Sequence, residues 1–177
     1  MDPLTAHERA QKAFASVLAG IGPDRFGDPT PCARWTVRDV AEHIIGGNFR
    51  VAGVTDPPAD DDLAALHGAS AAQAQATFAA PDGLTRDYVL PFGSLPGSVF
   101  IGLRTTDVLT HAWDLAKATG QPTDLDSELA EELLAASRER IDPSFRGEGR
   151  PFGEEQPCAS TRPAADRLAA FLGRRTD

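Results

Sequence analysis

The sequence is poor in cysteine and lysine, and it lacks any long apolar run. Its two cysteines, Cys32 and Cys158, stand far apart without a CxxC spacing. One disulfide is allowed, but reduced intracellular thiols are the expectation. No apolar stretch approaches the roughly 20 residues of a membrane span, and residues 1–12 show no apolar segment behind a basic head. We therefore expect a cytoplasmic protein with no signal peptide and no membrane partner.

Basic residues are also too few for a polyanion-binding surface. The formal net charge is -9, with 17 basic and 26 acidic residues, and the longest basic cluster is Arg174-Arg175. An acidic surface repels phosphate, so nucleic acid is not an expected partner. The length of 177 residues suits a single domain over residues 1–177.

What is abundant is apolar periodicity at helical spacing, which predicts an all-α fold. The predicted helices cover residues 3–21, 36 to about 47, 61–80, 96–119, 126–140 and a short 166–172. Thr36 and Asp39 resemble a capping box, and Gly120 is a typical helix stop. Residues 85–92 alternate loosely, as a short strand or an extended crossover would, and residues 142–163 read as an irregular tail.

The predicted helix 96–119 carries the chemistry. Phe100, Leu103, Asp107, His111 and Leu115 fall on one face. A carboxylate within an apolar stripe needs a partner, and Asp107 and His111 project side by side at i, i+4. Such a pair can grip a metal ion, although a local hydrogen bond is the more common reading of the spacing alone.

The other histidines are weaker candidates by spacing. His43 lies at the border of the apolar stripe of its helix, beside the small Gly47, where it could reach a cavity shared between helices or bond a neighbour. His7 is expected to be exposed to solvent. His67 lies on the Ala-rich third helix, which we expect at the edge of the bundle.

Three segments carry a recognisable pattern: TPCARWTVRDVAEHIIGG from Thr30, DVLTHAWDLAKATG from Asp107, and DRLAAFLGR from Asp166. They resemble the DinB/YfiT-like metal-binding bundles, and in particular the actinobacterial branch related to mycothiol-dependent maleylpyruvate isomerase. The resemblance implies a four-helix bundle with a long crossover between its second and third helices. Here it would be followed by additional C-terminal helices and the irregular tail.

The resemblance also implies one divalent metal, held by His43, Asp107 and His111. Two imidazoles and a carboxylate suit Zn²⁺ best, with Ni²⁺ or Fe²⁺ as alternatives. Three protein ligands leave a position open for a thiol, with mycothiol as the implied cofactor. Arg50 and Arg104 could bind a carboxylate of that cofactor or be solvated surface charges.

Several roles near this site stay open. Asp114 could orient His111 or be a solvated acid, and Trp35, Trp113 and Cys32 are expected to serve packing. The expected function is a mycothiol-dependent thiol transferase or isomerase that acts on a small electrophile. The residues do not separate such an enzyme from a non-catalytic metal- or small-ligand-binding protein, and they leave room for a homodimer.

Overall fold

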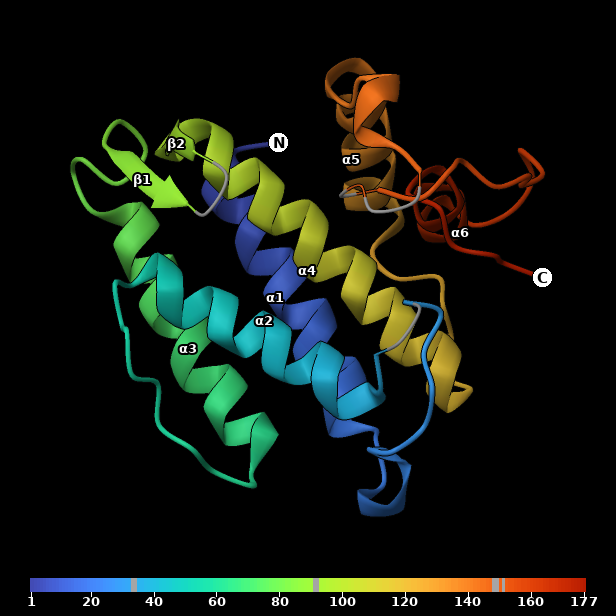
Figure 1. Ribbon diagram of the computed structural model, residues 1–177, viewed down its shortest axis with the longest axis horizontal. Helices are drawn as coiled ribbons and strands as arrows, with labels where there is room; N and C mark the ends of the chain where they lie inside the picture. The colour runs from blue at the N-terminus through green and yellow to red at the C-terminus, as the bar shows by residue number, and fades with distance from the viewer. Residues whose placement is uncertain (33–34, 91–92, 148–149, 151) are drawn as a thin grey trace.

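Six helices and one short hairpin make up the structure (Figure 1), which is a computed structural model that describes residues 1–32, 35–90, 93–147, 150 and 152–177. The helices are α1 (Pro3–Ala19), α2 (Val37–Val51), α3 (Leu63–Ala79), α4 (Gly97–Thr119), α5 (Ser127–Arg140) and α6 (Ala164–Phe171). Two single 3-10 turns, Pro23–Arg25 and Pro143–Phe145, interrupt the loops. The prediction of a mostly helical chain is confirmed. The ends of the helices agree within about two residues, except that α2 continues to Val51, about four residues beyond its expected end.

Helices α1 to α4 form the bundle. α1 packs against α4 and α3, and α2 packs against α3 and α4. Figure 1 shows α2 and α3 running in the same direction. Residues 52–62, which connect them, therefore run along the outside of the bundle from the end of α2 back to the level of its beginning, where α3 starts. This is the long crossover that the sequence resemblance implied, and it places α2 antiparallel to α4.

Local capping fixes where the two helices of the site begin and end. The Thr36 side chain accepts from the Asp39 backbone N–H, and the Asp39 carboxylate accepts from the Thr36 N–H, so the predicted capping box is present. Gly120 ends α4 with φ +72°, a left-handed conformation that favours glycine. The register of α2 and α4 is therefore set by their own sequences.

A two-stranded antiparallel hairpin precedes α4. β1 (Asp87–Leu90) pairs with β2 (Gly93–Pro96). Of residues 85–92, for which a short strand or an extended crossover was expected, 87–90 form the strand β1. Residues 85–86 belong to the preceding turn, and Pro91 and Phe92 lie outside the described residues. β2 was not predicted, because Gly93 and Pro96 are unfavourable in strands and it forms only by pairing with β1.

The C-terminal helices lie beside the second half of α4 (Figure 1). α5 and α6 pack against each other, and α6 packs against α4. Trp113 on α4 is buried and donates from Nε1 to Asp166 Oδ1 on α6 at 2.8 Å, so this tryptophan serves packing as predicted. Among the described residues, no helix is long and apolar enough to cross a membrane.

Candidate metal centre

The three residues predicted as metal ligands meet between α2 and α4. His43 Nε2 lies 3.2 Å from Asp107 Oδ2, and His111 Nε2 lies 3.4 Å from Asp107 Oδ1. One ligand atom from each residue lies within 4.8 Å of those of the other two. His43 reaches this point because the antiparallel packing sets it opposite Asp107, a residue 64 positions later.

The cluster is partly exposed to solvent. The side chains of His43 and Asp107 are 34% and 31% exposed, whereas that of His111 is 6% exposed. A ligand from solvent can therefore approach along His43 and Asp107, while His111 forms the floor.

Trp35 forms a wall of the cluster, a role the sequence reasoning missed. Its ring lies 4.7 Å from that of His43 and 5.6 Å from that of His111, nearly parallel to the latter at 22°. The indole is only half-buried. The sequence did contain one indication of this role. Trp35 directly precedes the capping-box residue Thr36, and the cap fixes where the residue before it lies relative to α2.

Asp114 orients His111 from the buried side. Its Oδ2 lies 2.9 Å from His111 Nδ1, and Asp114 is fully buried, so it is not the solvated acid that was the alternative. Burial alone would lower the pKa of His111, but hydrogen bonds and charges from Asp107 and Asp114 outweigh burial and raise that pKa to about 9. Without a metal, His111 is therefore a cation between two carboxylates.

Arg104 is buried rather than solvated. It is 6% exposed, and its Nη1 donates to Asp107 Oδ2 at 2.6 Å. Its Nη2 donates to Asn48 Oδ1 at 3.1 Å and to the Ile44 carbonyl at 3.2 Å. The alternative of a surface charge is thus wrong for Arg104, because the guanidinium lies in the space between α2 and α4.

Gly47 makes this burial possible. A Cβ at Gly47 would lie 2.5 Å from Arg104 Nη1, so no other residue leaves the guanidinium where it is. Gly47 was expected to leave room for a cavity beside His43, but Arg104 fills that room. Burial would raise the pKa of Asp107, but hydrogen bonds from the two imidazoles and the charge of Arg104 hold it well below its usual range.

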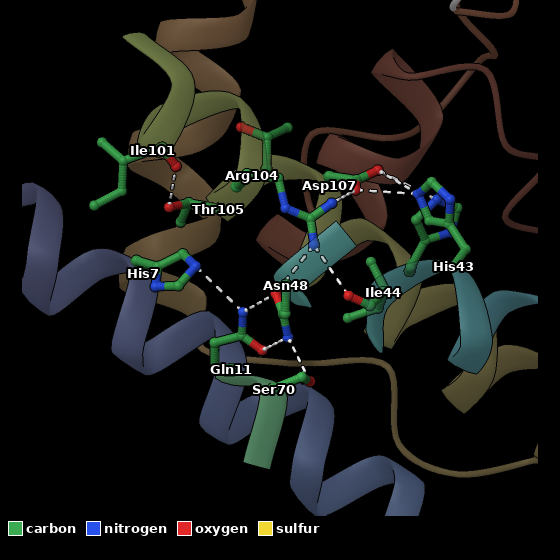
Figure 2. A network of polar contacts seen from close by, with 12 residues as sticks. His7, Gln11, His43, Ile44, Asn48, Ser70, Ile101, Arg104, Thr105 and Asp107 are labelled. Atoms are coloured by element: carbon green, nitrogen blue, oxygen red, sulfur yellow. Dashed lines mark hydrogen bonds and ion pairs between the residues drawn. The ribbon is translucent and has the colours of Figure 1, made fainter. Parts of the chain in front are cut away.

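A network of neutral polar groups continues from Arg104 into the bundle core (Figure 2). Asn48 Oδ1 accepts from Gln11 Nε2 at 2.8 Å, and Gln11 Oε1 lies 2.9 Å from His67 Nε2. His7 Nδ1 lies 2.7 Å from Gln75 Oε1. The prediction that His7 is exposed is wrong: it is fully buried, because α3 covers that face of α1.

The remaining candidates lie at the margin of the cluster. Arg50 is exposed on α2, two turns beyond His43, and its predicted cofactor role remains a prediction, as does that of Arg104. Cys32 is half-buried against the core, in line with a packing role, but its Sγ also lies within 4.8 Å of ligand atoms of His111 and Asp114. Burial raises the pKa of the Cys32 thiol.

Comparison with known proteins identifies the family of the chain. Residues 7–116 match the family model described as the mycothiol maleylpyruvate isomerase N-terminal domain. Two proteins from two strains of Mycobacterium tuberculosis, both described as uncharacterized, are 59% identical over 98% of this chain and 98% of their own length.

Solved structures share the fold. The crystal structure of the mycothiol-dependent maleylpyruvate isomerase superposes with a TM-score of 0.61 at 19% identity, covering 77% of this chain and 68% of that one. A histidine-to-alanine mutant of that enzyme gives 0.60 at 17% identity over the same shares. The chain therefore belongs to the family of the mycothiol maleylpyruvate isomerase N-terminal domain, within the DinB-like bundles.

Proposed function

We propose that the chain holds one divalent metal ion with His43, Asp107 and His111, and that it directs a metal-bound thiol, mycothiol, against a small electrophile. The reaction is a thiol transfer or an isomerisation. The observation that carries the proposal is the convergence of three donor groups from two helices within 4.8 Å, on the side of the cluster that solvent can reach.

The donor set fits such an ion. Two imidazoles with one carboxylate suit Zn²⁺, and also Ni²⁺ or Fe²⁺, and three protein ligands are typical of a site that keeps a position open. When bound, the ion would favour the thiolate form of a coordinated thiol, which is the nucleophilic form. The exposed flanks of His43 and Asp107 give that thiol its access.

The surrounding residues hold the donors in position. Asp114 accepts from His111 Nδ1 and thereby leaves Nε2 directed at the site. Arg104 engages Asp107 Oδ2, so Oδ1 is the oxygen left for an ion. Trp35 covers both imidazoles and shields them from water on one side.

Arg50 is the better placed of the two arginines to bind a carboxylate of the thiol cofactor or of the substrate. Its guanidinium is exposed, whereas that of Arg104 is occupied by Asp107, Asn48 and the Ile44 carbonyl. A thiol cofactor of this kind requires a reducing compartment, and both cysteines are free. We therefore place the activity in the cytoplasm.

The first test is elemental analysis after gentle purification, with a melting curve recorded before and after adding Zn²⁺. We expect a divalent metal at up to one per chain and a rise in melting temperature. No metal and no shift on adding Zn²⁺ would contradict the proposal.

The second test separates the enzyme from a binding protein. The metal-loaded protein is given mycothiol and chlorodinitrobenzene, a generic electrophile, and product is compared with the chelated protein. Turnover that depends on both metal and thiol supports the enzyme. Tight metal binding without turnover favours the non-catalytic alternative.

A further inference from the structure

Behind His111, the site is supported by a segment that the family match does not include. The match ends at residue 116, yet the Asp114 carboxylate that bonds His111 is itself bound by Arg174. Arg174 Nε lies 3.3 Å from Asp114 Oδ1, and Nη2 lies 3.1 Å from Oδ2. The side chain of Arg174 is only 15% exposed, so this bidentate pair is largely shielded from water.

The segment around Arg174, residues 172–177, is fastened along the end of α4, and we call it the C-terminal strap. Lys117 Nζ donates to the carbonyls of Thr176 and Asp177, both at 3.2 Å. Arg162 Nη2 donates to the same Thr176 carbonyl at 3.2 Å. Asp114 and Lys117, one turn apart on α4, therefore bind consecutive parts of the strap.

The turn into the strap is specified by glycine. Gly173 has φ +98°, and a Cβ there would lie 2.7 Å from the Cα of Gly153. The chain can pass this point only without a side chain. Arg174 then donates from Nη1 to the Leu172 carbonyl at 3.1 Å, which fixes its guanidinium toward Asp114.

We infer that Arg174 is a positioning residue for the metal centre: by holding the Asp114 carboxylate it fixes the ring of His111, so docking of the strap and binding of a metal ion are coupled. The inference rests on the metal-binding part of the proposed function. The Asp114 carboxylate is fully buried, and Arg174 binds both of its oxygens. Without Arg174 the carboxylate would be free to turn away from His111, and the ring of His111 would lose the acceptor that fixes its orientation.

The coupling has a reciprocal consequence. If a docked strap strengthens metal binding by some factor, a bound metal strengthens strap docking by the same factor. Zn²⁺ should therefore slow amide hydrogen exchange in residues 172–177, because Arg174 binds Asp114 and Asp114 bonds His111.

The test compares the full chain with its Arg174→Gln, Arg174→Lys and Arg175→Gln variants. Arg175 is the matched control, because it is the exposed neighbour and its replacement removes the same charge. Zn²⁺ affinity is measured by competition with a chelator. We expect Arg174→Gln to weaken Zn²⁺ binding by about 10- to 100-fold, Arg174→Lys to restore part of it, and Arg175→Gln to match the wild type.

A second measurement uses only the wild type, so it does not depend on whether a variant folds. Amide exchange of the wild type is followed with and without Zn²⁺, and slower exchange in residues 172–177 supports the coupling. Unchanged Zn²⁺ affinity in Arg174→Gln, or protection confined to α2 and α4, would overturn the role of the strap while leaving the metal centre intact. A wild type that binds no Zn²⁺ would instead overturn the proposed function, and the coupling with it.

Discussion

The bundle contains two pairs of histidines in contrasting surroundings. His43 and His111 face carboxylates between α2 and α4, whereas His7 and His67 face amides between α1 and α3. Burial lowers the pKa of His67 to about 4, but Asp107 and Asp114 overcome burial at His111 and raise its pKa to about 9. The charge of the partner, rather than depth, decides whether a buried imidazole is a cation or a neutral packing group.

Arg104 joins the two pairs (Figure 2). One edge of its guanidinium binds Asp107 of the charged cluster, and the other binds Asn48 of the neutral network. The neutral network therefore has a role in holding the arginine that holds the ligand carboxylate. Substitutions in the charged cluster and in the neutral network should therefore have different effects on metal content and on stability.

The largest contrast is expected between His111→Ala and His67→Ala. His111→Ala leaves two donors, too few for tight binding at a site with an open position, so metal content should fall to near zero. Its cost in stability should be modest, because Asp107 keeps Arg104 and His43 as partners and no buried carboxylate is left unpaired. Elemental analysis and melting curves, with and without Zn²⁺, measure both effects.

His67→Ala should behave in the opposite way. It leaves the buried Gln11 Oε1 short of a partner, which costs about 1–3 kcal/mol, while the metal is retained. The same should hold for His7→Ala, which loses the contact with Gln75. If His111→Ala kept the metal content of the wild type while His67→Ala lost its metal, the ligands would have been assigned to the wrong pair of histidines.

The next contrast is between two adjacent glycines of α2. Gly47→Ala places a Cβ 2.5 Å from Arg104 Nη1 and should destabilise the protein by about 1–3 kcal/mol, as overpacking does. A Cβ at Gly46 meets nothing within 4 Å, so Gly46→Ala should stabilise the helix by about 0.5–1 kcal/mol. Urea unfolding of both variants measures the difference, and equal effects would mean that Arg104 does not occupy the space above Gly47.

Local rules explain how much of this could be predicted from the sequence. Helical periodicity and the caps at Thr36 and Gly120 identified the helices, because they depend on neighbours in the chain. The i, i+4 spacing of Asp107 and His111 identified two donors on one face. His43 joined them only through family resemblance, since its spacing alone did not distinguish a ligand from a boundary residue.

What could not be predicted depends on contacts between distant residues. His7 is buried because α3 lies over it, with Gln75 68 positions away. Arg104 is buried because Gly47, on another helix, leaves space for it. Trp35 and Arg174 reach the site from segments outside the helices, where no periodicity indicates which way a side chain points.

A smaller effect is expected in the pH dependence of stability. The unfolded chain protonates His67 near its ordinary pKa of 6.5, but the folded protein does so only near 4, because burial opposes the charge. Folding stability should therefore fall as the pH drops from 6.5 toward 4, with no contribution from this group above that window. His67→Gln should lose less stability than the wild type between pH 7 and pH 5, measured by urea unfolding; parallel losses would show that His67 is not held neutral.

The smallest effect is expected for Arg50→Gln, which separates the exposed arginine from the buried one. Arg50 is exposed on α2, so its removal should change stability by less than about 0.5 kcal/mol and leave metal content unchanged. If it binds a carboxylate of the thiol cofactor, losing one charge-assisted contact at a solvated position should weaken thiol binding by about 2- to 10-fold.

Arg104→Gln should instead destabilise the protein, because Asp107 and Asn48 both lose their partner. Calorimetric titration of the metal-loaded variants with mycothiol measures the affinity, with Arg175→Gln as the control for the loss of one exposed positive charge. Equal thiol affinities in Arg50→Gln and Arg175→Gln would remove Arg50 from the site, while the metal ligands would stand.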